Sequence, residues 1–172
     1  PVGYAIGHAH RGRTVVVAST GSARALPTLG VVTLFGIILG IGLEAPLVAL
    51  VLLALPSVLA GAYAGVEGVT PEVVDAARGL GMTEWQILLR VEMPLGMPLL
   101  IGGIRSAALQ VLATATLAAY VGAGGLGRFL FLGLKTQNYP MMLASSLVVV
   151  LLAVAVELSF EVVDRLVRRT LP

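Results

Sequence analysis

The sequence has no cysteine and few charged or aromatic residues: 12% of its 172 residues are charged and 5% are aromatic. The absence of cysteine excludes disulfides, thiol nucleophiles and cysteine-bound metal clusters. Charged residues make up about 25% of an ordinary soluble domain, so their scarcity excludes a typical soluble fold. The net charge of +2 is too small for a nucleic-acid surface, and we expect no nucleic-acid partner.

Hydrophobic residues instead make up 58% of the chain, and the mean hydropathy is +0.99. A helix needs about 20 apolar residues to cross a hydrocarbon core of about 30 Å. Charge-free runs of that length cover residues 25–43, 45–66, 106–127 and 136–156. The alternation that marks barrel strands is absent. The sequence therefore predicts an all-α transmembrane fold with four spans in a lipid bilayer.

The first residues, 1–13, read "PVGYAIGHAHRGR", an apolar stretch followed by a basic one. A secretory signal has the opposite order. We therefore expect the end of a first span that precedes the sequence, followed by a cytoplasmic loop. His8 and His10 lie in this stretch, but two histidines alone do not make a metal site, and we predict none.

The basic residues predict the orientation, because short cytoplasmic loops are enriched in lysine and arginine. One side of the predicted spans carries Arg11, Arg13, Arg78, Arg90, Arg165, Arg168 and Arg169. The other side carries only Arg128 and Lys135. We therefore expect a multi-pass membrane protein whose carboxyl terminus and whose loop at residues 70–93 are cytoplasmic.

This loop contains the one long amphipathic stretch, "DAARGLGMTEWQILLRVEMP", residues 75–94. Thr70 and Pro71 suit the N-cap and first positions of a helix. The Gly-Leu-Gly sequence at 79–81 is expected to end that helix, because glycine tolerates a positive φ.

A second helix is predicted to begin with a capping box at Thr83 to Gln86. We expect it to end near Met93, because Pro94 disfavours helical backbone in the residue before it. At about 1.5 Å per residue this helix is too short to cross the bilayer. It rests either in the membrane interface, with Trp85 as an aromatic anchor, or against a partner protein.

The loop resembles the signature of permease subunits of binding-protein-dependent ABC importers. That signature reads E-A-A, three residues, G, then about nine residues to I-x-L-P. Asp75-Ala76-Ala77, Gly81 and the Val91 to Pro94 stretch match its spacing. Aspartate for glutamate, valine for isoleucine and methionine for leucine are mild departures that keep charge and apolar character.

The resemblance implies a type I importer, MetI-like permease core that forms one domain over residues 1–172. It also implies that the loop forms a coupling helix, which fits a groove in a cytoplasmic ATPase. The ATPase-coupling residues implied are Asp75, Ala76, Ala77, Gly79, Gly81 and Pro94.

The implied partners are an ABC ATPase dimer in the cytoplasm, a second permease copy or homologue, and an extracytoplasmic substrate-binding protein, separate or fused. The implied location is a bacterial or archaeal inner membrane. No G-x-x-x-x-G-K-[ST] phosphate loop occurs. We therefore expect no cofactor and no enzymatic activity in this chain, with ATP bound and hydrolysed by the partner.

The segments "AARGLGMTEWQILLRVEMP" and "TATLAAYVGAGGLGRFLFLGL" look most like the branch that imports osmoprotectants such as glycine betaine, choline and proline betaine. Methionine-importer permeases share the Gly-Ala-Gly-Gly-Leu-Gly segment. A permease for an amino acid such as methionine therefore stays an alternative, as does a secondary transporter that uses the loop only as an interfacial anchor.

The segment "GAGGLG" at 122–127 fits the dinucleotide fingerprint G-x-G-x-x-G, but it follows a transmembrane run rather than a strand. We interpret it as irregular backbone at the outer end of a span, which serves either as part of an external gate or for close packing. The residues concerned are Gly122, Gly124, Gly125 and Gly127.

Three other residues are candidates for the translocation path. Tyr63 and Tyr120 lie within predicted spans, and Glu157 is a carboxylate at the end of the last one. A carboxylate in a span is a functional candidate by default. Arg24 or Arg105 is its expected partner if Glu157 forms a structural ion pair rather than a contact with a cationic substrate.

Small residues spaced four apart predict close helix packing. Gly36 and Gly40 form one such pair, and Gly61 and Gly65 form another. Each pair puts small residues on one helix face, where a second backbone can approach. The partner is either another helix of the same chain or a second permease.

Overall fold

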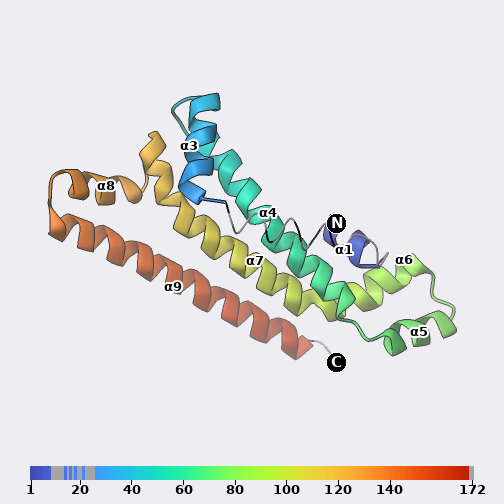
Figure 1. The fold of residues 1–172 in the computed structure, drawn as a ribbon. Coiled ribbons are helices and arrows are strands. Elements are labelled where there is room, and N and C mark those ends of the chain that lie inside the picture. The colour runs from blue at the N-terminus through green and yellow to red at the C-terminus, as the bar shows by residue number, and fades with distance from the viewer. Residues whose placement is uncertain (9–13, 15, 17, 19–20, 22–25, 171–172) are drawn as a thin grey trace. The chain divides into compact units, whose positions relative to one another are not determined.

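The computed structural model describes residues 1–8, 14, 16, 18, 21 and 26–170. Most of these residues lie in helices and none of them lies in a strand, so the predicted all-α fold is confirmed (Figure 1). The helices are α1 Val2–His8, α3 Thr28–Leu39, α4 Glu44–Glu67, α5 Pro71–Gly79, α6 Glu84–Ile87, the π-helix η1 Leu88–Glu92, α7 Met93–Ala115, the 3-10 helix η2 Leu117–Val121, α8 Gly127–Lys135 and α9 Tyr139–Thr170.

Three stretches of helix within the described residues are long and apolar enough to cross a membrane: Glu44–Glu67, Glu84–Ala115 and Tyr139–Arg169. The first predicted span, 25–43, contains the shorter apolar helix Thr28–Leu39. Twelve residues of α-helix extend about 18 Å, less than the hydrocarbon core. By length, α3 alone does not cross the bilayer.

The third span lies earlier in the chain than predicted. The charge-free run suggested 106–127, but α7 covers Met93–Ala115 and is followed by η2 and a glycine-rich turn. The prediction was wrong because it began the span after Arg105, whereas Arg105 lies inside α7. Its Nη1 atom is 3.5 Å from Oε2 of Glu161 on α9, so the charge within the helix has a partner.

The predicted helix end near Met93 was also wrong. Residues from Glu84 to Ala115 are continuously helical, through α6, η1 and α7. Met93 has helical φ and ψ of −62° and −49°, and its N–H donates to the carbonyl of Leu88, five residues earlier. Proline disfavours helical backbone before it but does not forbid it. The π turn immediately before α7 is a local adjustment of the hydrogen-bond ladder of the kind that admits proline.

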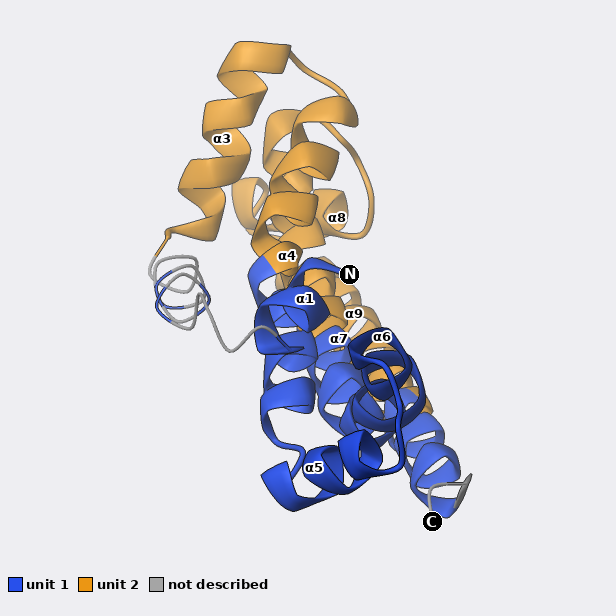
Figure 2. Ribbon diagram, turned by 90° about the vertical axis from the view of Figure 1, so that its right-hand side faces the viewer, with its two compact units in different colours: residues 1–24, 56–106, 160–172 blue, residues 25–55, 107–159 orange. Residues whose placement is uncertain are grey.

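The described helices form two compact units (Figure 2). One, blue in Figure 2, contains residues 1–24, 56–106 and 160–172, so it holds the 70–93 loop and the helices around it. Its main buried cluster joins Tyr4, Ala62, Val66 and Leu88. Residues of α1, α4 and η1 therefore share one apolar core.

Glycines let helices α4 and α7 approach closely within this unit. A Cβ atom added at Gly65 would lie 2.6 Å from the carbonyl oxygen of Gly96, and one at Gly61 would lie 2.8 Å from the Cα of Gly103. The predicted packing role of the Gly61 and Gly65 pair is therefore confirmed. Its partner is a second glycine pair in the same chain.

The other unit, orange in Figure 2, contains residues 25–55 and 107–159. In it α3 packs on η2, where a Cβ at Gly36 would lie 3.0 Å from Val121 Cγ1. Helix α8 also packs on η2. The Ser145 hydroxyl of α9 donates to the carbonyl of Leu126, 2.8 Å away, just before α8 begins.

The α4–α7 approach predicts unequal effects of alanine at two neighbouring glycines. At Gly103 an added Cβ meets the Ser57 carbonyl oxygen at 2.7 Å, whereas at Gly102 it meets nothing within 4 Å. Overpacking costs about 1–3 kcal/mol. We expect Gly103→Ala to lower the melting temperature of the detergent-solubilised protein by roughly 3–10 °C and Gly102→Ala to leave it unchanged or slightly raised. Equal melting temperatures for the two variants would refute the close approach.

Candidate functional site

The 70–93 loop begins with the helix that its sequence predicts. Thr70 is the N-cap residue, with extended backbone, and Pro71 occupies the first turn of α5. The Thr70 side chain makes no capping hydrogen bond. Helix α5 ends at Gly79, and Gly81 has φ +81°, a value that glycine adopts without the strain of a Cβ atom. The chain therefore turns here as predicted.

The second short helix opens with the predicted capping box. The Thr83 N–H donates to Gln86 Oε1 at 2.9 Å, and the Gln86 N–H donates to Thr83 Oγ1 at 3.4 Å. Helix α6 begins at Glu84 and leads through η1 into α7. The loop is therefore joined to a membrane-spanning helix without an intervening coil.

A small apolar cluster holds the two loop helices together. Val74 and Ala77 of α5 pack against Ile87 of α6, and all three side chains are buried. This packing uses Ala77 inside the loop rather than on its surface. Leu80 and Trp85, in contrast, are the most exposed large apolar side chains of the loop, with exposed fractions of 84% and 68%.

An arginine connects the same two helices through charge. Arg78 Nε donates to Glu84 Oε1 at 2.7 Å, and Nη2 donates to Oε2 of the same carboxylate at 3.0 Å. Nη1 donates to Asp75 Oδ1 at 3.1 Å. A two-pronged guanidinium–carboxylate contact fixes direction as well as distance. The hydrogen bond with Glu84 is the main cause that raises the pKa of Arg78 above its ordinary value, so the guanidinium stays charged.

A histidine distant in the sequence continues this network. His8 Nδ1 lies 2.7 Å from Glu92 Oε2, and His8 Nε2 lies 3.3 Å from Glu84 Oε2. Glu92 is only 3% exposed. An imidazolium donates from both ring nitrogens and so suits two carboxylates. His8 thus attaches the end of α1 to both α6 and η1, a role that the sequence did not indicate.

We name the set Asp75, Arg78, Glu84, His8 and Glu92 the charged clasp. Beside it, a cavity of about 100 Å³ is lined in part by Glu67, Asp75, Arg78 and Glu92. Among the described residues, no three His, Cys, Asp or Glu side chains are placed so that they could hold a metal ion. The contacts of the charged clasp hold α5, α6, η1 and the end of α1 together.

The residues that the family resemblance implies for ATPase coupling differ in how far they are exposed. Asp75, Ala76, Gly79 and Gly81 are exposed on the loop, and Ala77 is buried. Pro94 is half-buried in the first turn of α7. The structure therefore brings the exposed four together on one loop and places Pro94 in the helix that follows.

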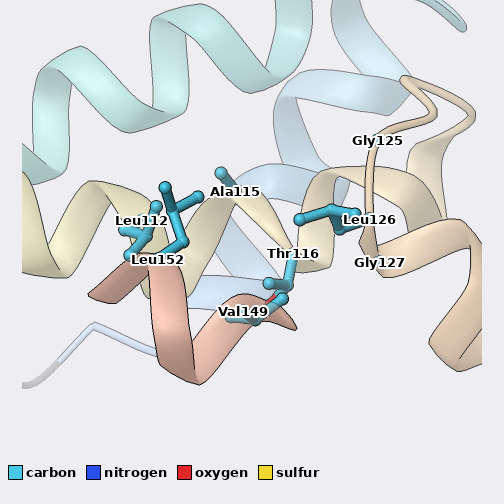
Figure 3. A pocket seen from close by; sticks show the side chains of 8 residues that line it. All are labelled: Leu112, Ala115, Thr116, Gly125, Leu126, Gly127, Val149 and Leu152. Carbon is cyan, nitrogen blue, oxygen red and sulfur yellow. The ribbon is translucent and has the colours of Figure 1, made fainter. Parts of the chain in front are cut away.

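The implied gate glycines lie in the other unit. Gly122 has φ +83°, and Gly124 and Gly125 each have φ +78°, so the backbone between η2 and α8 is irregular, as expected. Gly127 is buried against Thr116, where a Cβ would overlap the Thr116 carbonyl. Figure 3 shows Gly125 and Gly127 beside an apolar pocket of about 140 Å³, with Leu112, Val149 and Leu152 also in its wall.

The other path candidates do not form one cluster. Tyr63 is buried in the unit that holds the loop, where its hydroxyl donates to Glu67 Oε1 at 2.7 Å. Tyr120 and Glu157 belong to the other unit. Glu161, four residues after Glu157, forms an ion pair with Arg105. Arg24, His10, Arg11 and Arg13 lie outside the described residues, so the predictions that involve them stay predictions.

Comparison with known proteins gives consistent matches. A family model described as "Binding-protein-dependent transport system inner membrane component" matches residues 1–169. The glycine betaine/carnitine/choline transport system permease protein OpuCB of Bacillus subtilis is 30% identical over 165 residues, which cover 96% of this chain and 76% of the relative. The carnitine transport permease protein OpuCB of Listeria monocytogenes is 34% identical over 157 residues, or 91% of this chain and 72% of the relative.

The fold also matches a solved structure. A chain of the MetNI methionine ABC transporter in an inward-facing conformation superposes with a TM-score of 0.79 over 97% of this chain and 84% of that chain. The two are 22% identical, so the likeness concerns the fold alone. It confirms the predicted MetI-like permease core.

The contact between His8 and Glu92 predicts coupled effects on stability. His8→Ala leaves the Glu92 carboxylate buried without its imidazole partner, which costs about 1–3 kcal/mol. We expect faster amide hydrogen exchange at residues 84–92 in this variant. Adding Glu92→Gln removes the buried charge and is expected to restore part of the protection. If the effects of the two substitutions are simply additive, the contact does not hold the loop.

Proposed function

The chain belongs to the binding-protein-dependent transport system inner membrane component family, and from that premise we propose that it is the translocation subunit of an ATP-driven importer of small osmoprotectants. Family membership excludes the secondary-transporter alternative. The observation that carries the proposal is the rigid loop at 70–93, which two short helices, an apolar cluster and the charged clasp hold in one shape.

The coupling role rests on what this loop exposes. Leu80 and Trp85 are large apolar side chains with most of their surface open, at either side of the turn around Gly81. Exposed apolar groups with a rim of charge are typical of a protein contact. We assign this surface to a cytoplasmic ABC ATPase, with Asp75, Ala76, Gly79 and Gly81 around the contact.

The helix that continues from the loop into the membrane determines how a movement of the loop is transmitted. Helices α6, η1 and α7 run without a break from Glu84 to Ala115. A displacement imposed on the loop by a closing ATPase therefore acts directly on a spanning helix, because no flexible coil absorbs it. We assign the binding and hydrolysis of ATP to the partner ATPase.

The assembly requires a second permease and a substrate-binding protein. The family description refers to a binding protein, and it is a family of inner-membrane components. We propose a pair of permeases, identical or homologous, with the carboxyl terminus in the cytoplasm. The basic end of α9 supports this orientation, since Arg165, Arg168 and Arg169 follow its apolar stretch. The glycine-rich turn at 122–127 is then at the external side, where we place part of the gate.

The substrate class follows from the relatives. Their names include glycine betaine, carnitine and choline, all of which carry a quaternary ammonium group. We propose that this chain transports compounds of the same class. The likeness to the methionine transporter concerns the fold and does not favour methionine.

ATP-driven uptake of labelled glycine betaine tests the proposal. The full-length permease is reconstituted with its ATPase and binding protein, and excess choline, carnitine, proline betaine or methionine is added separately. We expect quaternary amines to inhibit uptake at least tenfold more strongly than methionine. Uptake that methionine suppresses, or an assembled complex without glycine betaine uptake, would contradict the substrate class.

A further inference from the structure

Two adjoining cavities lie where α8 packs on η2. The larger, about 520 Å³, is lined by Ala119, Tyr120, Phe131, Leu134 and Lys135. The smaller, about 200 Å³, is lined by Ala119, Arg128, Phe131, Leu132 and Lys135. Three residues belong to both walls, so the cavities are neighbours. The larger one alone falls within the range of about 300–1,000 Å³ that small-molecule sites occupy.

The charges at this site are all positive. Arg128 and Lys135 are the only charged residues between positions 106 and 156. They lie seven residues apart on α8, which places both on one face of the helix. Both are exposed, and neither forms an ion pair with any residue that the structure describes. An anionic group that enters the cavities meets two cations and no competing carboxylate from this stretch.

An aromatic pair lies beside these cations. The rings of Tyr120 and Phe131 have centroids 5.8 Å apart and planes inclined by 57°. Tyr120 is 62% exposed, so its ring is open to a ligand. The face of an aromatic ring attracts a cation, and a quaternary ammonium is a preferred ligand because it is large and weakly hydrated. One cavity wall therefore offers π faces and a lysine together.

We propose that these cavities form a binding site for a zwitterion that carries a carboxylate and a quaternary ammonium group. The carboxylate faces Lys135 and Arg128, and the ammonium group faces the rings of Tyr120 and Phe131. The inference rests on the proposed import function and adds a selection step to it. Glycine betaine and carnitine have both groups. Choline has the ammonium group but lacks the carboxylate, so it has no negative charge to offset the repulsion from the two cations.

Uptake by charge variants tests the carboxylate half of the site. The complete complex, with permease, ATPase and binding protein, is assayed with glycine betaine, carnitine and choline separately. Lys135→Gln is expected to lower uptake of the two zwitterions roughly 3–10-fold and to leave choline uptake unchanged or higher. Lys135→Arg keeps the charge and is expected to lower uptake of the zwitterions less than Lys135→Gln does.

A matched pair of aromatic variants tests the ammonium half. Phe131 lines both cavities, whereas Phe129 lies on the same helix, is exposed and lines neither. We expect Phe131→Leu to lower zwitterion uptake several-fold and Phe129→Leu to have little effect. Equal losses in both variants would show a general requirement for aromatic residues on α8 and overturn the site.

The remaining outcomes separate this inference from the proposed function. Lys135→Gln without effect on the zwitterions, or with equal loss for all three compounds, overturns the zwitterion site. If Lys135→Gln lowers uptake of all three compounds equally and this loss disappears in vesicles without anionic lipid, the two cations bind a lipid headgroup instead. A wild type that takes up only choline overturns the site and leaves the importer assignment standing. A wild type that takes up none of the three overturns the proposed function, and the zwitterion site with it.

Discussion

The contact between Arg78 and Glu84 is the constraint on which the 70–93 loop depends. Helices α5 and α6 have nine and four residues, and isolated helices of that length are unstable in water. Their shared apolar cluster is small. The guanidinium binds the carboxylate through two nitrogen atoms, and His8 then connects this carboxylate to buried Glu92. An exposed ion pair alone contributes little, but this one belongs to a network with a buried end.

The position of buried Glu92 explains how the loop is fixed to the membrane-spanning helix α7. Glu92 is the last residue of η1, directly before α7. The clasp therefore holds the loop at the point where the π turn passes into a spanning helix. Farther along, glycine pairs in α4 and α7 bring the two backbones into contact. A loop fixed to one helix, which is itself closely packed on another, is suited to transmit displacement rather than to absorb it.

Local sequence rules predicted the local features of this structure. The Thr83–Gln86 capping box, the Pro71 helix start and the positive φ of Gly81 all depend on neighbouring residues, and all were found. Features that depend on distant residues were not predictable. We expected a span to begin after Arg105, but Arg105 lies inside α7, where Glu161 pairs with it. The π turn admits Pro94 within a continuous helix. His8 reaches Glu92 across 84 positions, and no local pattern signals that contact.

The most direct test of the coupling account is a charge swap across the clasp, read out as ATP-driven uptake by the assembled complex. Arg78→Glu and Glu84→Arg each place like charges together, and each is expected to lower uptake at least tenfold at an unchanged amount of permease in the membrane. The double variant restores opposite charges and is expected to recover uptake several-fold over either single variant. Normal uptake by the single variants would show that this contact does not position the loop for coupling.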